Sequence, residues 1–553
     1  MYKKVSTMDN IRIINNVVNG GPPFKIPAHI SFGQYVIDKL RSLIKEGASL
    51  ALINGETGQE ITYQQLLKEV VNIGTGLKKI GVKRGDVVGL CSENRFEYLA
   101  AAVGIICCGA AATTINVQYT ADELKHVLNI SKPNVIVCSE KSAAQHIRTL
   151  KSMKYIQKII QFDGIPVDKS VLSYCQVKEN IDEKYFEAEP VEGWTDVAYI
   201  LYSSGTTGLP KGVMLSHLNV LYSAATFDNE DKVDSELVTR LLTVVPWYHA
   251  YGLMSTINNL MIRKVLIYFS GFNPQLYLNA IQTHKANMLL AVPPIVVFLA
   301  KSPLVEKYDL SSVYVVMCGA APLSTETISE ACKRLPSCLG IYQGYGMTET
   351  SLLATKDLIE MARKPGSAGY PVRGVKAKVV DLDTRRKLGA NKKGEICIKG
   401  PIIMKGYAGN RAATREIFDE EGYLRTGDIG FFDDEGCFFI VDRLKELIKY
   451  KGSQVPPAEV ESVLLQHPGV SECGVVGAPD EAAGELPTAF VVLKPGIRLE
   501  PRVLVDFAAQ RLSPSKRLHG GVIFVEEIPK NPSGKILRRK LKQKLLQMKK
   551  SKL

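Results

Sequence analysis

Short apolar runs alternate with longer amphipathic segments through the first two thirds of the chain. The runs at 86–90 and 134–138 are predicted to be buried strands, and the helices that follow are predicted to begin near Arg95 and to span 141–151. Strands separated by helices predict parallel sheets with helices packed on both faces. Further strands of this kind are predicted at 241–245, 265–269 and 313–317.

The pattern changes near residue 369. Closely spaced strands and turns over 369–407 predict an antiparallel β subdomain, and the last hundred residues predict a small α+β unit. The elements of that unit are predicted to be a helix after Pro456 and Pro457, a strand over 489–493, a helix over 503–512 and a strand over 522–529.

These patterns together predict an α/β fold with two domains. The large N-terminal domain, 1–441, is expected to hold two α/β subdomains, with helices flanking mixed sheets, and a β subdomain over about 369–441. A hinge is expected at 442–445, and 446–553 is expected to form a small C-terminal domain. A chain of 553 residues is too long for one compact core, which supports the division.

The composition is that of an ordinary globular protein, with 46% hydrophobic and 23% charged residues. The nearest candidate for a membrane span, 98–115, is rich in Ala, Gly, Cys and Thr and follows Glu97, so we expect a buried helix that leads into a buried strand. Residues 1–10 lack the apolar core of a signal peptide. Eleven cysteines without a C-x-x-C pair or a metal-ligand spacing predict reduced thiols in an intracellular protein.

The net charge is +13, and the excess lies near the end of the chain, between Arg538 and Lys552. No zinc-finger spacing, heptad-backed basic helix or ribonucleoprotein signature accompanies it. We therefore expect a solvated basic tail and no binding of nucleic acid, and a basic nucleic-acid-binding protein stays as an alternative.

A loop rich in Gly, Ser and Thr directly follows the apolar strand at 197–202. Glycines let backbone N–H groups approach phosphate oxygens, the hydroxyls donate further hydrogen bonds, and Lys211 supplies a countercharge. Neither the Walker A spacing nor G-x-G-x-x-G is present. The alternative is a flexible connection. The predicted phosphate-binding residues of this loop are Ser203, Ser204, Gly205, Thr206, Thr207, Gly208 and Lys211.

The loop resembles the phosphate loop of the adenylate-forming superfamily, which includes acyl-CoA synthetases, coumarate–CoA ligases, beetle luciferases and the adenylation domains of peptide synthetases. Other signatures of this superfamily follow in the right order, and the likeness runs from about residue 45 to 540. They are Gly-Tyr-Gly-Met-Thr-Glu at 344–349, Tyr-Leu-Arg-Thr-Gly-Asp at 423–428, the hinge segments at 441–445 and 448–452, and Pro-Ser-Gly-Lys at 532–535.

The resemblance implies a two-step reaction. The carboxylate of an acid attacks the α-phosphate of ATP, which gives an acyl-adenylate and pyrophosphate, and coenzyme A then takes the acyl group as AMP leaves. A site for this reaction must gather several negative charges around fixed cations and donors. ATP, Mg²⁺ and coenzyme A are therefore expected.

By resemblance, Glu349 helps to hold Mg²⁺, Thr348 contacts the α-phosphate and Tyr345 stacks on adenine. Asp428 is expected to bind both ribose hydroxyls, because a carboxylate offers two acceptor oxygens, with Arg443 beside it. The alternatives are a turn role for Asp428 and a surface ion pair for Arg443. The ATP-binding set also includes Gly319, Ala320, Ala321, Gly344, Gly346 and Lys535.

Two lysines of the small domain are expected to divide the reaction. By resemblance, Lys535 spans the carboxylate and the α-phosphate during adenylation, and the mobile small domain then rotates about Lys445. The face around Lys449, with Lys451 and Gly452, would then bind coenzyme A and serve thioester formation. The alternative for Lys449 is an ordinary solvated lysine.

An aromatic segment is expected to line the acyl and thiol channel. His249 and Tyr251, in Pro-Trp-Tyr-His-Ala-Tyr-Gly at 246–252, match the superfamily's segment beside the acyl site, and a satisfied structural histidine is the alternative. The acyl-binding set is completed by Gly319, Gly346, Leu352 and Leu353.

Several departures from the superfamily's patterns narrow the substrate. No Asp or Glu occurs over 243–258 and no carrier domain follows residue 540, so an amino acid is not expected. Leu352, Tyr342 and Ser223 stand where beetle luciferases carry polar or basic residues around luciferin. The chain thus resembles insect luciferase-like peroxisomal fatty acyl-CoA synthetases, which implies a medium- or long-chain fatty acid. A luciferin monooxygenase and a hydroxycinnamate–CoA ligase stay as alternatives.

The chain ends in Ser551-Lys552-Leu553, the tripeptide that the peroxisomal import receptor reads at this position. We therefore expect the protein in the peroxisomal matrix.

Overall fold

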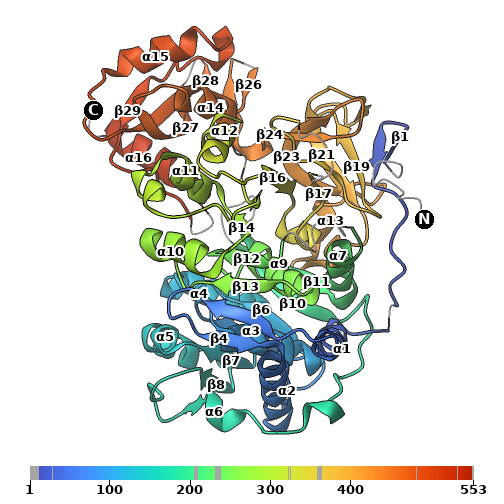
Figure 1. Cartoon of the computed structure of the whole chain (residues 1–553). Helices are drawn as coiled ribbons and strands as arrows, with labels where there is room; N and C mark the ends of the chain where they lie inside the picture. Colours follow the sequence, from blue (N-terminus) through green and yellow to red (C-terminus); the bar gives the residue numbers. More distant parts are fainter. Residues whose placement is uncertain are drawn as a thin grey trace, which may run out of the picture.

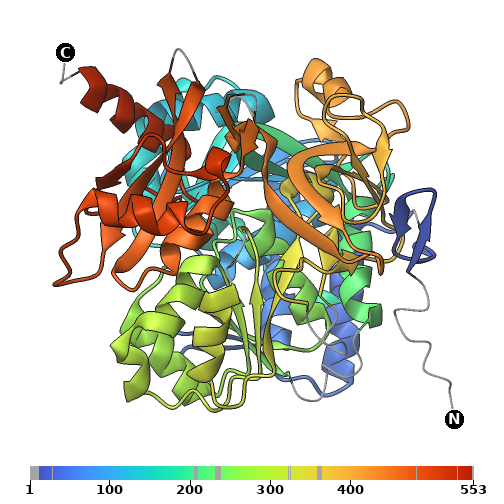
Figure 2. The same ribbon diagram turned by 90° about the horizontal axis from the view of Figure 1, so that it is seen from above.

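The computed structural model describes residues 11–27, 29–204, 210–230, 238–321, 323, 325–357, 364–451, 453–480, 483–531 and 534–550. Four β-sheets organise this part of the chain, three in the large domain and one in the small domain (Figure 1). The small domain contains helices α14 (Pro457–Leu465), α15 (Pro501–Ala509) and α16 (Arg538–Lys550). Seen from above, it lies beside the antiparallel subdomain that is built mainly from residues 376–443 (Figure 2).

The first large sheet has nine strands, and its six central strands are parallel. Its order is β18-β17-β16-β15-β14-β12-β13-β3-β4. The strands are β3 (Leu50–Asn54), β4 (Glu60–Thr62), β12 (Arg240–Thr243), β13 (Val265–Tyr268), β14 (Met288–Ala291), β15 (Val315–Cys318), β16 (Gly340–Tyr345), β17 (Thr355–Lys356) and β18 (Tyr370–Pro371).

The second sheet has eight strands, and β5 is its topological switch point because β6 and β7 flank it on opposite sides. Its order is β22-β11-β10-β6-β5-β7-β8-β9. The six strands from β10 to the β9 edge run parallel to one another. The strands are β5 (Val87–Cys91), β6 (Ala111–Thr114), β7 (Val135–Cys138), β8 (Lys158–Gln161), β9 (Val171–Ser173), β10 (Val197–Ser204), β11 (Pro210–Ser216) and β22 (Gly406–Tyr407).

Helices pack against these sheets, and most of them share one large apolar core with both sheets, while α4 and α5 pack on the second sheet in a separate apolar cluster. Helix α1 illustrates how the sequence specifies such a helix. Ser31 caps it by accepting the N–H of Gln34, and apolar residues that recur every three or four positions are buried. The helices of the large domain are α1 (Phe32–Lys45), α2 (Tyr63–Lys79), α3 (Phe96–Cys107), α4 (Ala121–Ser131), α5 (Glu140–Ser152), α6 (Tyr174–Val177), α7 (His217–Glu230), α9 (Ala250–Met261), α10 (Pro274–His284), α11 (Pro293–Lys301), α12 (Thr325–Lys333) and α13 (Arg411–Glu416).

The third sheet is antiparallel and follows the order β1-β2-β19-β21-β23-β24, with β20 paired to β19. Two of its strands come from the N-terminus, which the sequence pattern did not indicate, and they lie beside the orange strands in Figure 1. Its strands are β1 (Arg12–Ile14), β2 (Val17–Asn19), β19 (Lys376–Val380), β20 (Lys387–Leu388), β21 (Gly394–Lys399), β23 (Leu424–Phe432) and β24 (Phe438–Arg443).

The small domain is built on a sheet with the order β26-β25-β28-β27, and β29 pairs with β28. Its sheet begins just after the predicted hinge, and the short helix η5 (Leu444–Glu446) connects it to β24. Its elements are β25 (Ile448–Tyr450), β26 (Ser453–Val455), α14 (Pro457–Leu465), β27 (Val470–Asp480), β28 (Gly484–Leu493), α15 (Pro501–Ala509), β29 (Val522–Phe524) and α16 (Arg538–Lys550).

These elements confirm the predicted α/β class with a large and a small domain. The segment 98–115 is a buried helix followed by a buried strand, as expected. Within the described residues, the structure has no helix with the length and apolar character that a membrane crossing requires. None of the eleven cysteines forms a disulfide.

The basic end of the chain is exposed to solvent at Arg539, Lys540 and Lys544, as predicted, but over its described residues it is packed on the small domain and is not a mere tail. This segment is helix α16, whose Leu541 and Leu545 are buried in the core of the small domain. Arg538 is almost buried and pairs with Glu461 at 3.0 Å. The basic residues occupy the remaining face of an amphipathic helix, which charge counting alone does not distinguish from a disordered tail.

Candidate active site

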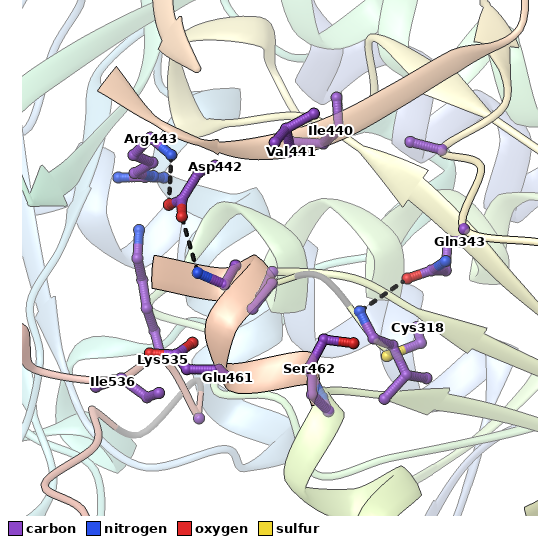
Figure 3. A pocket seen from close by; sticks show the side chains of 18 of the residues that line it. Cys318, Gln343, Ile440, Val441, Asp442, Arg443, Glu461, Ser462, Lys535 and Ile536 are labelled. Atoms are coloured by element: carbon purple, nitrogen blue, oxygen red, sulfur yellow. Dashed lines mark hydrogen bonds between the residues drawn. The ribbon is translucent and has the colours of Figure 1, made fainter. Parts of the chain in front are cut away.

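A cavity of about 630 Å³ lies between the two domains (Figure 3). On the large-domain side it opens where β14, β15 and β16 end, which is where parallel sheets usually bind ligands. On the small-domain side, helix α14 and the segment 534–538 close it. The predicted site residues that line it are Ala320, Ala321, Gly344, Tyr345, Gly346, Asp428, Arg443 and Lys535.

Tyr345, Asp428 and Arg443 form a connected group at one wall of the cavity. The Tyr345 hydroxyl donates to Oδ2 of Asp428 at 2.7 Å, and Nε of Arg443 lies 3.2 Å from Oδ1. Asp428 and Arg443 come together because they are paired neighbours in β23 and β24. Burial, and then the charge of Asp428, raise the pKa of Tyr345 well above its ordinary value, so the hydroxyl stays protonated. The group holds a buried carboxylate ready to accept further donors, such as hydroxyls.

Lys535 extends into the same cavity from the small domain (Figure 3). Its backbone is held by a turn in which its N–H donates to Oδ1 of Asn531 at 2.8 Å. The turn lies tight against the large domain, because a Cβ on Gly534 would come within 2.5 Å of Pro294. Burial, and then the charge of Arg443, lower the pKa of Lys535 to about 7. Two cationic groups so close together favour the binding of an anion between them.

Ser203 and Glu349 meet next to the loop predicted to bind phosphate. Oε1 of Glu349, which is 3% exposed, accepts the hydroxyl of Ser203 at 2.8 Å and that of Tyr407 at 3.0 Å. Nζ of Lys211, the strand partner of Ser203, lies 4.9 Å from the centre of the Tyr407 ring. The backbone of Ser204 ends strand β10, while Gly205, Thr206, Thr207 and Gly208 lie outside the described residues.

Tyr407 is a site residue that the sequence reasoning missed. It is 58 residues from Glu349 along the chain, so no spacing links the two. Tyr407 reaches the site because β22 joins the edge of the second sheet beside β11. Burial, and then the charge of Glu349, raise the pKa of Tyr407, which keeps its hydroxyl a donor.

The residues around Glu349 fit a magnesium ion. Mg²⁺ prefers oxygen ligands and is usually held by one or two carboxylates, waters and the phosphates of a substrate. Glu349 supplies a buried carboxylate with hydroxyls around it, and Thr348 directly precedes it in the short helix η4 (Thr348–Thr350). The described residues contain no group of three or more His, Cys, Asp or Glu side chains, which would suit a metal bound by the protein alone.

The predicted acyl side lies at the ends of β14 and β15. The hydroxyl of Tyr251 donates to the carbonyls of Ala291 at 3.0 Å and Met317 at 3.3 Å, and its ring covers Gly319, where a Cβ would lie 3.2 Å away. Nε2 of His249 is buried and has no hydrogen-bond partner among the described residues. Burial lowers the pKa of His249 to about 4, so its ring is neutral at physiological pH.

Leu352 and Leu353 lie directly behind the glycines of the 344–349 segment. A Cβ on Gly346 would come within 1.7 Å of the carbonyl oxygen of Leu352, and a Cβ on Gly344 within 2.7 Å of Leu353. Leu352 is buried in the main core, and Leu353 packs against that core. Both leucines are thus one layer behind the cavity lining.

The residues predicted for thioester formation lie away from the cavity. Lys449 is exposed on β25, where its N–H donates to Glu485 at 3.0 Å, and Lys451 is exposed just after this strand. Gly452 lies outside the described residues. Lys445 is in η5, and burial, followed by the charge of Arg443, lowers its pKa. The structure therefore brings Lys535 to the cavity and leaves Lys449 outside it.

Comparison with known proteins identifies the family. The AMP-binding enzyme model matches residues 44–408, and the AMP-binding enzyme C-terminal domain model matches 459–535. A luciferin 4-monooxygenase of Nipponoluciola cruciata is 40% identical over 96% of this chain and 97% of its own length. 4-Coumarate–CoA ligase 3 of Arabidopsis thaliana is 39% identical over 95% of this chain and 93% of its own length. Among solved structures, ATP-bound MatB from Rhodopseudomonas palustris is 28% identical, with a TM-score of 0.83, over 93% of this chain and 99% of that one.

These matches confirm the predicted resemblance, and at the level of the family they confirm an AMP-forming acid–thiol ligase. They leave open which acid the enzyme activates. The AMP-binding model alone covers more than half of the sequence, and the chain therefore belongs to the AMP-binding enzyme family of the adenylate-forming superfamily.

Proposed function

We propose that this protein is an acyl-CoA ligase that activates a medium- or long-chain fatty acid and transfers it to coenzyme A. The observation that carries the proposal is the cavity between the domains, where Lys535, Arg443 and Asp428 come together from two domains and three sequence motifs. Two half-buried cations beside a buried carboxylate suit the anionic and the hydroxyl parts of a nucleotide.

In the first half-reaction the carboxylate of the acid attacks the α-phosphate of ATP and pyrophosphate leaves. Asp428 has both oxygens at the cavity wall to accept ribose hydroxyls, and Arg443 fixes its orientation. Lys535 becomes protonated as the anions enter and neutralises the charge that develops between carboxylate and phosphate. The buried position of these groups strengthens each interaction, because the local dielectric is low.

Glu349 would hold the magnesium ion that accompanies ATP, and this ion would neutralise part of the charge on the phosphates. Ser203 and Tyr407 orient the carboxylate by donating to one of its oxygens. The β10–β11 pairing places Lys211 opposite Ser203, which donates to this carboxylate.

The second half-reaction needs the thiol of coenzyme A to attack the acyl carbon, with AMP as the leaving group. Lys449 and Lys451 are exposed on the small domain and can serve this step only after the domain has turned. The separation of Lys449 from Lys535 supports such a division, because one rigid domain can present only one of these faces at a time.

The proposed fatty acid is supported by the apolar layer behind the cavity. The side chains of Leu352 and Leu353 are apolar and pack in or against the main core, and the Leu353 side chain lies directly behind Gly344, while the carbonyl oxygen of Leu352 lies behind Gly346. His249, in the segment predicted to line the acyl channel, has a neutral ring, so it brings no charge that would oppose an alkyl chain. Each methylene group buried there contributes up to about 0.8 kcal/mol to binding.

A second candidate substrate is an aromatic acid. The high identity with a luciferin 4-monooxygenase and with a 4-coumarate–CoA ligase favours it. The ring of Tyr251, flat against Gly319, could border a planar acid as well as an alkyl chain. We also propose the peroxisomal matrix as the location, because of the terminal Ser551-Lys552-Leu553, which lies outside the described residues.

A panel that measures pyrophosphate release tests these proposals. The acids are saturated fatty acids of graded length, hydroxycinnamates and luciferin, each with and without coenzyme A. We expect kcat/KM to rise with chain length until the pocket ends, and acyl-CoA to form only when coenzyme A is present. A hydroxycinnamate that is used more efficiently than every fatty acid would replace the proposed substrate, and light with luciferin and oxygen would favour a monooxygenase.

A further inference from the structure

Helix α14 of the small domain begins without a cap of its own. Its N-cap residue is Pro456 and its first residue is Pro457, and no side chain from the N-cap position accepts a hydrogen bond. The first N–H groups of a helix have no partner within the helix and need an outside acceptor. For Ala458 this acceptor is Oδ2 of Asp442, at 2.9 Å (Figure 3).

Asp442 belongs to the other domain. It lies on β24, opposite Ile429 of β23, and is therefore part of the third sheet of the large domain. Its side chain is 6% exposed, and its second oxygen accepts the N–H of Arg443 at 2.7 Å. A carboxylate held rigidly by one domain thus caps a helix of the other, where the helix dipole favours a negative charge.

Charges of both signs surround this contact. Arg538 of α16 attracts the Asp442 carboxylate, whereas Glu446 of η5 repels it, and Arg538 also pairs with Glu446 at 3.4 Å and with Glu461 of α14 at 3.0 Å. Burial opposes the ionised form of the carboxylate and raises the pKa of Asp442. The cost of burying this charge therefore offsets part of what the contact contributes to holding the two domains together.

The hinge makes this contact specific for one orientation. Lys445 lies between Asp442 and α14 along the chain, so a rotation at Lys445 must carry the helix away from the carboxylate. The orientation that the contact holds also places Lys535 in the cavity. A hydrogen bond of 3.3 Å from Gln466, the C-cap residue of α14, to Glu326 of α12 joins the domains at the other end of the same helix.

We infer that Asp442 is a positioning residue for acid activation: by capping α14 across the domain boundary, it holds the small domain where Lys535 reaches the cavity. The inference rests on the proposed function for the role of Lys535, but the geometry of the contact does not depend on it. Asp442 is then needed for adenylation and dispensable for thioester formation.

A crosslinking experiment tests the domain orientation without any substrate. Cysteines replace Glu326 and Gln466, and a short bismaleimide joins the two cysteines when the domains have the orientation seen here. Each single-cysteine variant measures the background reaction of the native thiols. Adding Asp442→Ala should slow crosslinking by about 3- to 30-fold, the range that the loss of one helix cap produces. Asp442→Asn keeps an acceptor oxygen, so its crosslinking rate should fall much less than that of Asp442→Ala. Asp434→Ala, which removes an exposed carboxylate from the same domain, should change nothing.

The half-reactions supply the functional readout. Asp442→Ala should lower acid-dependent pyrophosphate exchange by a similar factor and leave thioester formation from a supplied acyl-adenylate unchanged, and the crosslink should restore exchange. Undiminished crosslinking in Asp442→Ala, or an equal loss of both half-reactions that the crosslink does not restore, would overturn the inference. If no acid supports exchange in the unaltered enzyme, the proposed function fails, while the crosslinking rates still decide the role of Asp442.

Discussion

Replacing Lys535 by methionine should abolish a proton uptake that accompanies binding of the adenylate. Burial and the charge of Arg443 lower the pKa of Lys535 from 10.5 to about 7. An anionic ligand between these two cations offsets the effects of burial and of Arg443, because its negative charge favours the protonated lysine, and it therefore restores a high pKa. Binding should therefore draw a proton from solution at any pH above the pKa of the free enzyme.

The size of the uptake follows from the fraction of Lys535 that is already protonated. With a pKa of about 7, this fraction is about 0.1 near pH 8 and about 0.9 near pH 6. If the bound form is fully protonated, about 0.9 proton is taken up per ligand near pH 8, and about 0.1 near pH 6. The uptake should thus fade on acidification.

Titration calorimetry with an acyl-sulfamoyladenosine, an anionic and stable analogue of the adenylate, measures this directly. The binding enthalpy is recorded in buffers of different ionisation enthalpy, and the slope gives the number of protons. Lys530→Met is the matched control, because Lys530 lines the same cavity but is paired with Glu472 at 2.8 Å, and it should keep the uptake. An unchanged uptake in Lys535→Met, or no uptake in the unaltered enzyme near pH 8, would refute the reasoning.

The same pKa shift has a consequence for stability. Because the folded protein binds this proton less tightly than the unfolded chain, folding is opposed most strongly below about pH 7 and less as the pH rises toward 10.5. Lys535→Met removes this opposition. The melting temperature of the variant should therefore exceed that of the unaltered protein by more at pH 6 than at pH 9, and a constant difference would contradict the assignment.

Four further changes have defined outcomes. Lys449→Ala should slow thioester formation from a supplied acyl-adenylate by about 10²–10³ and spare pyrophosphate exchange, and equal damage to both steps would contradict its assignment. Glu349→Gln should raise the magnesium concentration needed for half-maximal exchange, because the carboxylate charge is lost, and an unchanged requirement would show that another group holds the ion. Leu352→Ala should lower the free energy of unfolding by about 2–5 kcal/mol in urea titrations, and a loss below 1 kcal/mol would contradict its burial in the core. Deleting 551–553 should move a fluorescently tagged protein from peroxisomal puncta to the cytosol with catalysis intact, and persistent puncta would show that the tripeptide is incidental.

The sequence predicted which residue types the site contains better than it predicted the contacts between them. Asp428 and Arg443 lie in separate motifs, and their pairing follows from the register of the antiparallel strands β23 and β24. A motif indicates such residues because the reaction needs a carboxylate and a cation, even where the sequence does not show which residue each of them contacts. The placement of Lys535 in the cavity agrees with this view.

Contacts between distant segments could not be predicted in the same way. A period of two residues indicates a strand but not the sheet that it joins, so β1, β2 and β22 were not assigned to their partners. Tyr407 reaches Glu349 through such a pairing, and Asp442 caps α14 across a domain boundary. The burial of Arg538 depends on carboxylates from two other elements, and charge alone suggested a solvated tail instead.

The transfer of ¹⁸O from a labelled acid tests the central claim most directly. A fatty acid with both carboxyl oxygens labelled is incubated with ATP, magnesium, coenzyme A and the enzyme, and the products are analysed by mass spectrometry. If the acid is activated as an acyl-adenylate, one ¹⁸O appears in AMP and one stays in the acyl-CoA, with unlabelled pyrophosphate. Label in inorganic phosphate together with ADP, or acyl-CoA formed without labelled AMP, would contradict the account.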